Sequence, residues 1–390
     1  MKRLRDPVHD YVLLDDLALA LVDRPEFQRL RNVRQLGTVH LVYPGANHSR
    51  FEHCVGAHHL ARMATEELSL PERDAAHVRA AVLLHDVGHG PFSHLSEEIV
   101  KRETGRGHVR IGCDLLLDGP LGDVLRDHGL EPARVAELVA GKGELGKLVS
   151  GELDVDRMDY LARDSHYTGV TVGLDVERIV SKLLWTKGRL ALHEEGLAAA
   201  ETLLVTRFLM YTAVYFHHTC RAAEMMLRQA IDAALAEGLL SGEELSRMDD
   251  VALLARLRSG ADASRRWLAR VEERRLHKLA FEATFAQAGR DAIARHGGHD
   301  GRRRLEAALA SEAGVPEEDV LVDVPEPPIL QEVDVRIVGP SGERPIVEAS
   351  KIVGILREAQ MDHWRLRVYA DAAAREKVAQ AAPRVLAQAR

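Results

Sequence analysis

An apolar run in the first quarter of the chain ends in two adjacent side chains that can bind a metal ion. The segment AAVLLHDVGHGPFSH places His85 and Asp86 at the end of a predicted helix, and Gly88, Gly90 and Pro91 then turn the chain away. A neutral imidazole beside a carboxylate suits Mn, Fe or Zn, with water in the remaining coordination positions. An isolated His-Asp pair is more often a core histidine bonded to its neighbour, so this pair alone does not establish a metal site.

Two other segments supply side chains of the same kind. RFEHCVGAHHLA places His53 on a second predicted helix, and GELDVDRMDYLARDSHYTGV carries several aspartates on or near a third. Asp156, Tyr160 and Asp164 recur every four residues, so they share one face of that helix. Burying charged carboxylates against an apolar core costs free energy, whereas carboxylates that line a pocket can serve a functional site. The three segments together favour a metal-containing pocket.

The order of these motifs resembles that of the HD-domain metal-dependent phosphohydrolases, and within them the deoxynucleoside triphosphate triphosphohydrolases. RFEH, HDVGHGPFSH and DVDRMDY carry the resemblance, and DPVHD, DRPEFQRLR and LARDSHYTGV extend it through the first half of the chain. It implies that His53, His85, Asp86 and Asp156 hold one divalent ion, which could be Mn, Fe, Zn, Ni or Mg, and it allows a second Mg with the substrate phosphates. The ion would activate a water for attack on the α-phosphorus and neutralise charge in the transition state. The implied products are a deoxynucleoside and triphosphate.

The resemblance also implies roles for histidines that follow the HD pair. His94 is the candidate acid that protonates the departing nucleoside oxygen, and Glu97 would orient it. His89 and His108 stand where relatives have further active-site histidines, although GRGHVR around His108 departs from the usual pattern. A solvated glutamate at a helix start is an equally good interpretation of Glu97.

A substrate site is implied as well, with cationic groups for the phosphates and polar or aromatic groups for the nucleoside. The residues are Gln35, Arg50, Arg157, Tyr160, Asp164, Arg207, Tyr211 and Tyr215. Gln35 with Asp164 would hydrogen-bond the 3′-hydroxyl, and Tyr215 would crowd a ribose 2′-hydroxyl and so favour deoxyribose. Tyr211 stands where animal members carry histidine. From the residues alone, the segment from Arg207 to Tyr215 would be interpreted as an ordinary amphipathic core helix.

The segment DRPEFQRLR resembles the strip with which activated family members bind a guanine nucleotide at an oligomer interface. Asp23, Gln28 and Arg31 would take part, which implies a GTP or dNTP activator and a homo-oligomer. Capping and ion pairing around a helix start explain an Asp and an Arg there equally well.

Composition limits the other classes of function. A net charge of −8 and an aromatic content of 4% make nucleic acid an unexpected partner, and a small anionic substrate fits better. Three scattered cysteines predict no disulfide framework, and no segment is predicted to cross a membrane, so a cytoplasmic protein is expected. Two alternatives stay open: an HD phosphohydrolase acting on a monophosphate, cyclic nucleotide or alarmone, and a nucleotide sensor without turnover.

The hydrophobic periodicity predicts a mostly α-helical fold with a small C-terminal α+β unit, and the resemblance implies that the helices form an HD-domain bundle. We expect an HD phosphohydrolase core at 1–235, a helical extension at 236–315 and the α+β unit at 316–390. Within these, long helices are expected at 198–236 and 243–258, a hairpin turns at Lys187 and Gly188, and a C-terminal helix breaks near Pro383.

Overall fold

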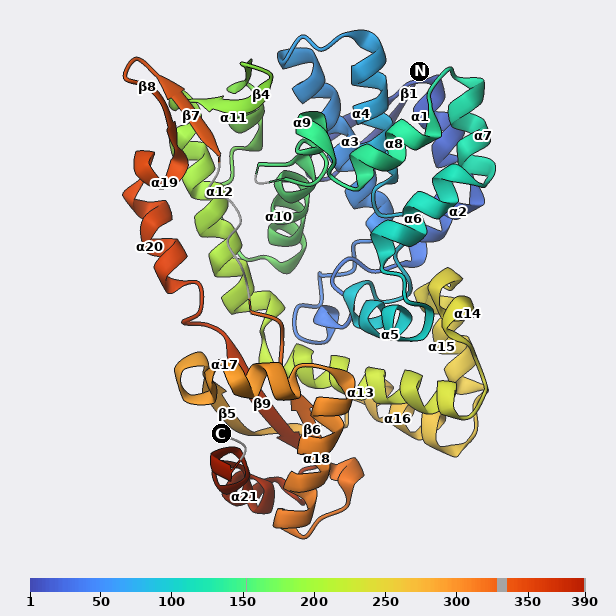
Figure 1. Ribbon diagram of the computed structural model, residues 1–390. Helices are drawn as coiled ribbons and strands as arrows, with labels where there is room; N and C mark the ends of the chain where they lie inside the picture. The colour runs from blue at the N-terminus through green and yellow to red at the C-terminus, as the bar shows by residue number, and fades with distance from the viewer. Residues whose placement is uncertain (152, 328–334, 389–390) are drawn as a thin grey trace. The chain divides into compact units, whose positions relative to one another are not determined.

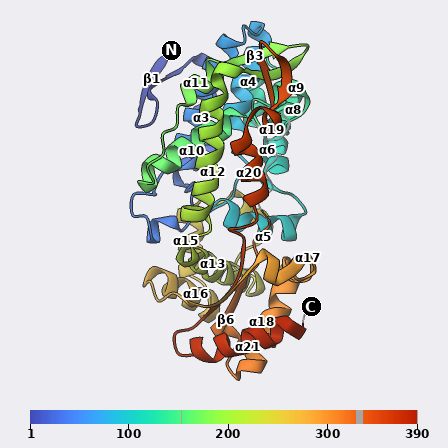
Figure 2. The ribbon, with the colours of Figure 1, turned by 90° about the vertical axis from the view of Figure 1, so that its left-hand side faces the viewer.

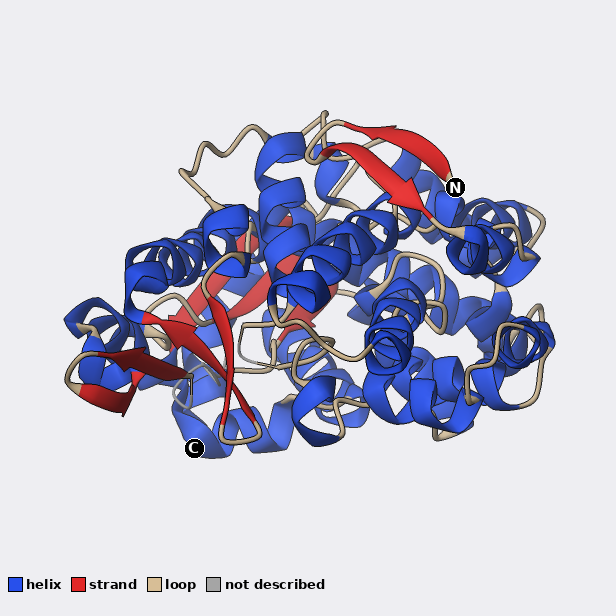
Figure 3. Ribbon diagram, turned by 90° about the horizontal axis from the view of Figure 1, so that it is seen from above, coloured by secondary structure: helices blue, strands red, loops and turns tan. Residues whose placement is uncertain are grey.

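The chain folds mostly into helices with short strands between them, which confirms the predicted fold class (Figures 1 and 3). This computed structural model describes residues 1–151, 153–327 and 335–388. The chain forms two units that alternate along the sequence. The first comprises Met1–Met210, Ser241–Leu253 and Gln331–Leu356, and the second comprises Tyr211–Leu240, Leu254–Leu330 and Arg357–Arg390.

The first unit contains an N-terminal hairpin, a helical bundle and a mixed sheet. Its strands are β1 (Lys2–Asp6), β2 (Asp10–Leu14), β3 (Leu183–Thr186), β4 (Arg189–His193), β7 (Arg336–Gly339) and β8 (Gly342–Pro345). Its helices are α1 (Asp16–Val22), α2 (Pro25–Gln28), α3 (Arg50–Glu67), α4 (Glu72–Leu84), α5 (His94–Thr104), α6 (His108–Leu117), α7 (Pro120–Asp127), α8 (Pro132–Val139), α9 (Gly143–Gly146), α10 (Val155–Thr168), α11 (Val176–Val180), α12 (Leu197–Met210), α14 (Gly242–Arg247) and α19 (Ile346–Ala349). Helices α15 (Asp250–Arg258) and α20 (Lys351–Ala359) begin in this unit and end in the second.

Helices α3, α4 and α10 form the centre of the bundle, and local sequence fixes where two of them begin. Ser49 caps α3 in a capping box, because its N–H donates to Glu52 while its side chain accepts from the backbone of that residue. Asp154 caps α10 by accepting the N–H of Arg157 at 2.6 Å. Helix α3 packs against both α4 and α10, and α10 and α12 lie side by side in both views (Figures 1 and 2). These contacts bring three distant segments to one place.

The mixed sheet of the first unit has the strand order β3-β4-β7-β8. Strands β3 and β4 form the predicted hairpin, in which Lys187 and Gly188 have φ angles of 51° and 73°. Strand β7 then pairs with β4 in parallel and with β8 in an antiparallel manner.

The second unit packs helices against a three-stranded antiparallel sheet of order β5-β9-β6. Its elements are α13 (His218–Ala236), α16 (Asp262–Glu272), β5 (Lys278–Thr284), α17 (Phe285–His296), α18 (His299–Ala313), β6 (Val320–Asp323), β9 (Arg365–Ala370) and α21 (Arg375–Gln388). Buried Trp364, Leu366 and Val368 lie in its core with Leu309 of α18 and Val378 of α21. Strand β9 lies between β5 and β6, so it holds the sheet together.

The strands of the segment 316–390 belong to two sheets, whereas the sequence predicts that they form one small α+β unit. Strands β7 and β8 extend the sheet of the first unit, while β6 and β9 pair with β5 in the second. Strand β4, which pairs with β7, and strand β5, which pairs with β9, lie far away in sequence, and strand alternation within a segment does not reveal such partners. The three predicted segments, 1–235, 236–315 and 316–390, therefore differ from the two interleaved units.

Three predicted helices have different limits from those expected. The helix expected at 198–236 is divided, because α12 ends at Met210, a π-helical turn spans Tyr211–Tyr215 and α13 begins at His218. The helix expected at 243–258 is two helices, α14 and α15. The expected break near Pro383 is wrong, since α21 continues through that residue.

Among the residues that the structure describes, one helical stretch is long and apolar enough to cross a membrane by length and composition alone. It spans Glu194–Tyr215, and 33% of its most apolar 18-residue segment is buried inside the structure. The expectation that no segment reaches this threshold is wrong. Core helices of soluble proteins pass the same test.

Candidate active site

The four predicted metal ligands come together at the centre of the first unit. His53 lies on α3, His85 and Asp86 follow α4, and Asp156 lies in the first turn of α10. His53 Nε2 is 2.9 Å from Asp156 Oδ1 and 3.3 Å from His85 Nε2, and His85 Nε2 is 3.4 Å from Asp86 Oδ1. Donor atoms of His53, His85 and Asp86 all lie within 4.8 Å of one another. The four residues that the resemblance implies as ligands therefore lie in one spatial cluster.

Both histidines turn the same ring nitrogen toward the cluster. His53 donates its Nδ1–H to Asp159 at 2.8 Å, and His85 donates its Nδ1–H to the carbonyl of Val82 at 2.7 Å. In the neutral rings both Nε2 atoms then carry lone pairs, and they face each other. A divalent cation satisfies two such nitrogens and the carboxylates of Asp86 and Asp156 together. The donor set fits the metal that the sequence predicts.

The electrostatics of the cluster also favour a cation. Burial lowers the pKa of His53, but Asp156 and Asp159 outweigh it and raise that pKa to about 10. Burial likewise opposes the charge of His85, yet Asp86 and Asp156 raise its pKa above the ordinary value. The carboxylates thus create a potential that attracts positive charge to the Nε2 atoms. A bound cation would occupy the place of those protons.

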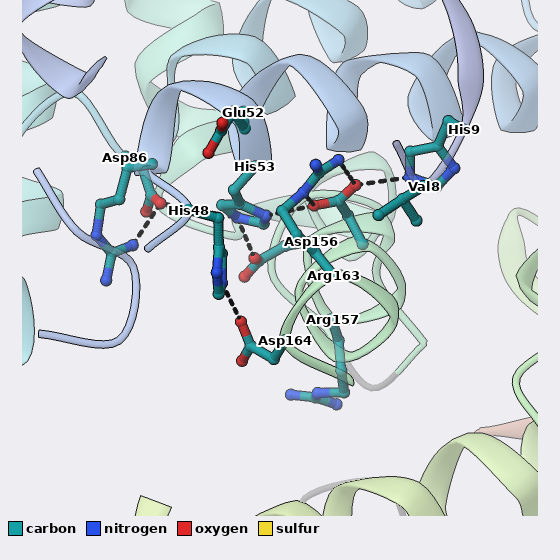
Figure 4. A network of polar contacts seen from close by, with 12 residues as sticks. Val8, His9, His48, Glu52, His53, Asp86, Asp156, Arg157, Arg163 and Asp164 are labelled. Atoms are coloured by element: carbon teal, nitrogen blue, oxygen red, sulfur yellow. Dashed lines mark hydrogen bonds and ion pairs between the residues drawn. The ribbon is translucent and has the colours of Figure 1, made fainter. Parts of the chain in front are cut away.

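A buried network behind His53 holds its ring in place (Figure 4). Asp159 accepts hydrogen bonds from His53, from His9 at 2.6 Å and from Arg163 at 2.9 Å. Arg163 also donates to Asp6 of β1 at 2.9 Å, and Asp6 accepts the N–H of His9. The sequence predicts no role for these residues, because His9 and Asp159 are 150 positions apart. The signal that could have found them is the histidine and aspartate within DPVHD.

Arg50 connects the metal cluster to the chain that follows the HD pair. Its Nη1 donates a short hydrogen bond to Asp86, and its Nε donates to Ser93 Oγ at 2.7 Å. Ser93 Oγ in turn donates to the carbonyl of Arg34 at 2.7 Å. Within the described residues, Arg50 Nη2 is buried and has no hydrogen-bond partner. An anionic ligand would satisfy that N–H group.

The candidate catalytic histidines lie together beside Asp86. His89 Nε2 is 3.3 Å from Asp86, and its ring stacks on His108 with centroids 3.9 Å apart. Glu97 accepts from His94 Nδ1 at 3.0 Å and from His108 Nδ1 in a shorter bond. Burial raises the pKa of Glu97, but these histidine bonds outweigh it and hold the pKa well below the ordinary value. The glutamate therefore orients both rings, and it is not merely solvated at a helix start.

His94 differs from its neighbours in being open to solvent. Its side chain is 74% exposed, whereas His89 is buried. A group that delivers a proton to a departing oxygen must reach the substrate, so exposure suits the role expected of His94. The side chains of His89, His94 and Glu97 also lie close enough together to hold a second ion.

Three of the predicted substrate residues, Arg157, Tyr160 and Asp164, lie on α10, and Gln35 is joined to Asp164 through His48. The Tyr160 ring lies with its centroid 6.5 Å from that of His53, and Asp164 accepts from His48 Nε2 at 2.7 Å. Gln35 donates its backbone N–H to the carbonyl of His48, and its buried Oε1 has no partner among the residues that the structure describes. The side chain of Arg157 is 13% exposed. His48 was not predicted, although it precedes RFEH by two residues.

The remaining predicted contacts come from the end of α12 and the turn after it. Arg207 is buried in the first unit. Tyr211 and Tyr215 belong to the second unit, on the π-helical turn, with ring centroids 5.2 Å apart and almost perpendicular planes. The structure therefore places Arg207, but not the two tyrosines, in the unit that contains the metal cluster.

The three residues expected at a regulatory site have local contacts. Gln28 donates to the carbonyl of Val22 at 2.7 Å and accepts from Arg31 at 2.8 Å. The guanidinium of Arg31 lies 3.5 Å from the centroid of the Phe51 ring, and Asp23 is exposed at the end of α1. These contacts agree with either interpretation of the segment.

Family models match both parts of the chain. Residues 50–164 match the HD domain, and residues 174–389 match the HD associated region. The chain belongs to the HD-domain phosphohydrolases. The HD match begins at Arg50 and ends at Asp164, so it includes all four predicted ligands of this HD phosphohydrolase.

Similarity over almost the whole chain extends to a protein without an assigned activity. An uncharacterized protein of Methanocaldococcus jannaschii is 32% identical over 377 residues, which are 95% of this chain and 79% of that protein. The deoxynucleoside triphosphate triphosphohydrolase SAMHD1 homolog of Dictyostelium discoideum is 29% identical over 72% of this chain and 60% of its own length. Human SAMHD1, also named as such a triphosphohydrolase, is 34% identical over 46% of this chain and 35% of its own length. This HD phosphohydrolase therefore spans less than two thirds of the Dictyostelium triphosphohydrolase and about a third of the human one.

Solved structures agree with the fold over almost the whole chain. A hypothetical protein from Aquifex aeolicus has a TM-score of 0.79 and 27% identity, and the match covers 98% of this chain and 99% of that one. A phosphohydrolase from Bacteroides thetaiotaomicron has a TM-score of 0.76 and 26% identity, covering 95% and 100%.

Proposed function

We propose that this HD phosphohydrolase hydrolyses deoxynucleoside triphosphates to deoxynucleoside and triphosphate, using one divalent metal ion. The observation that supports it most is the His53, His85, Asp86 and Asp156 cluster with Arg50 beside it. A buried guanidinium N–H next to a metal is a binding arrangement for a phosphate group. A divalent ion bound there would supply an activated water and would neutralise phosphate charge.

The side chains around the cluster have separable tasks in this proposal. Arg50 and Arg157 bind phosphate oxygens, which holds the α-phosphorus near the metal site. Glu97 fixes the ring of His94, which delivers a proton to the departing nucleoside oxygen. His53 and His85 keep their Nε2 atoms toward the site because their Nδ1–H groups are already bonded.

The deoxynucleoside part of the proposal rests on resemblance and on polar atoms near α10. Gln35 with Asp164 would bind the 3′-hydroxyl, Tyr160 would contact the sugar, and Arg207 would reach the terminal phosphate. The triphosphohydrolase names of the Dictyostelium and human relatives support this substrate class.

Regulation and setting are part of the same proposal. A GTP or dNTP activator would bind near Asp23, Gln28 and Arg31, in a homo-oligomer located in the cytoplasm. Manganese is a suitable ion for the His/Asp donor set, and a second Mg would accompany the triphosphate.

A substrate panel tests the proposal. The purified protein is incubated with each dNTP and rNTP, a nucleoside monophosphate and a cyclic nucleotide, in Mn or Mg, with and without GTP. We expect dNTPs, but not rNTPs, to yield a nucleoside and intact triphosphate as the products. Release of orthophosphate from the monophosphate, or opening of the cyclic nucleotide, would replace dNTPs with that compound as the substrate class. Nucleotide binding without turnover would indicate a nucleotide sensor.

A further inference from the structure

A strained turn lies between the HD pair and the candidate acid. Phe92 and Ser93 have φ angles of 55° and 56°, and neither is glycine. L side chains rarely adopt this left-handed region, and such residues persist only when the surrounding structure holds them there. The turn leads directly into α5, whose first residue is His94. Something in the fold must therefore hold this turn.

Asp250, from a distant part of the chain, supplies that hold. Its Oδ1 accepts the N–H of Phe92 at 2.6 Å, and its Oδ2 accepts the N–H of Arg34 at 3.1 Å. The carboxylate is 4% exposed and lies at the start of α15, 158 positions after Phe92. One carboxylate thus fastens two loops: the turn before His94 and the segment before Gln35.

The two fastened loops are also bonded to each other and to the metal cluster. Ser93 Oγ donates to the carbonyl of Arg34 and accepts from Arg50, which donates to Asp86. A continuous series of hydrogen bonds therefore runs from Asp250 to a metal ligand. The hydrogen bonds described for Asp250 go to Phe92 and Arg34, and neither of these residues is a predicted metal ligand.

The segment that carries Asp250 is anchored beside the same loops. Arg29 donates to the carbonyl of Met248 at 2.8 Å and to that of Val87 at 2.9 Å, so it ties this segment to the HD turn. Helix α14 packs against α5, and its Leu245 carbonyl lies close to Gly90. This segment falls within the HD associated region, outside the residues matched by the HD domain.

We propose that Asp250 is a positioning residue, through which the HD associated region holds the strained Phe92–Ser93 turn and so places His94 and Arg50 at the metal site. The inference rests on phosphohydrolase chemistry at this site and does not depend on the dNTP substrate. Binding of the metal itself would not require Asp250.

The test compares Asp250→Asn with Asp249→Asn in the full chain. An amide at position 250 can accept from only one of the two N–H groups, and its own NH₂ group then faces the other. Asp249 is an adjacent carboxylate that caps α15 through the N–H of Ala252. Steady-state kinetics use a dNTP and bis(p-nitrophenyl) phosphate, and metal content is measured on the same samples.

We expect kcat to fall about 10- to 100-fold in D250N, because small displacements of reacting groups have effects of that size, with KM changed far less. Metal content should equal that of the wild type, and D249N should keep its kcat. Hydrogen exchange in peptides covering Phe92 and Arg34 should accelerate in D250N and not in D249N. Hydrogen exchange shows whether Asp250 fixes the turn even if the wild type hydrolyses no dNTP. In that case only the proposed dNTP substrate would be rejected.

A second variant keeps the proposal testable if D250N does not fold. Asp250→Glu retains the charge but displaces the carboxylate by one methylene, so kcat should again fall while thermal unfolding remains cooperative. Unchanged exchange at Phe92 and Arg34 together with wild-type kcat per folded molecule, in either variant, would overturn the proposal.

Discussion

Single side chains at this site act through the neighbours that fix them. His53 can direct its Nε2 to the metal site because Asp159 accepts its Nδ1–H, and Asp159 is held by Arg163 and His9. The four ligands could be predicted from the sequence, since each belongs to a short motif in a set order. Their support could not, because His9 and Asp159 are joined only by folding. Periodicity places Asp156, Tyr160 and Asp164 on one face but says nothing about Asp159 on another.

Replacing Asp159 tests this support at the metal. Asp159→Asn should weaken divalent metal binding about 10- to 100-fold, because partners of ligating histidines commonly have effects of this size. Titration of the apoprotein with Mn measures it. Asp175→Asn is the control, since Asp175 is an exposed carboxylate that caps α11. Equal affinity in D159N and wild type would contradict the assigned role.

Asp250 predicts a pH dependence of stability. Burial raises its pKa to about 6 from an ordinary 3.8, although N–H groups of Phe92 and Arg34 oppose the rise. Because the folded pKa is the higher one, the stabilising contribution is complete below about pH 4 and is lost as the pH rises through about 6. A rise in pKa of that size corresponds to a change of about 3 kcal/mol in the free energy of unfolding.

Urea unfolding of wild type and D250N across this range measures the contribution. The free energy of unfolding of the wild type, relative to that of D250N, should fall by up to about 3 kcal/mol between pH 4 and pH 7. A difference between the two proteins that stays constant with pH would show that the Asp250 carboxyl does not titrate in this way.

At the scale of elements, close approach of helices α3 and α10 makes the site. Gly56 of α3 permits it, because a Cβ there would lie 2.0 Å from Asp159 Oδ1 and 2.1 Å from Arg163 Nη2. Sequence periodicity predicted these helices well. It missed the π-helical turn at Tyr211–Tyr215 and the separation of α14 from α15, because neither involves a proline or glycine break inside the pattern.

Two glycine substitutions test the approach of the helices. Gly56→Ala should destabilise the protein by about 1–3 kcal/mol, as overpacking of a core does, and should reduce metal content. Gly354→Ala in α20 meets nothing within 4 Å and should be neutral or stabilising by about 0.5–1 kcal/mol. Thermal unfolding measures both. Equal stability of the two variants would mean that α3 and α10 do not approach so closely.

At the scale of the whole molecule, residues from the C-terminal third complete structures that begin much earlier. Strand β7 extends the sheet begun by β3 and β4, and β9 lies between β5 and β6. The sequence predicts a C-terminal unit with its own strands, but strand pairing depends on partners that only the fold brings near. The predicted three-part division therefore cannot be used to choose truncations.

Removal of residues 357–390 tests this organisation. The deletion takes away β9 and α21, leaving β5 and β6 without their shared partner and the core around Leu309 exposed. We expect the second unit to lose cooperative unfolding and to become sensitive to limited proteolysis. A truncated chain whose second unit resists protease as the wild type does would contradict the sheet assignment.

The most direct test of the metal-dependent phosphohydrolase account is the metal content of wild type and the H85A/D86A double variant, measured by mass spectrometry alongside turnover. The wild type should hold a divalent ion that the variant lacks, with helical circular dichroism retained and hydrolysis abolished. Full metal retention in the variant, or undiminished hydrolysis without metal, would contradict the account.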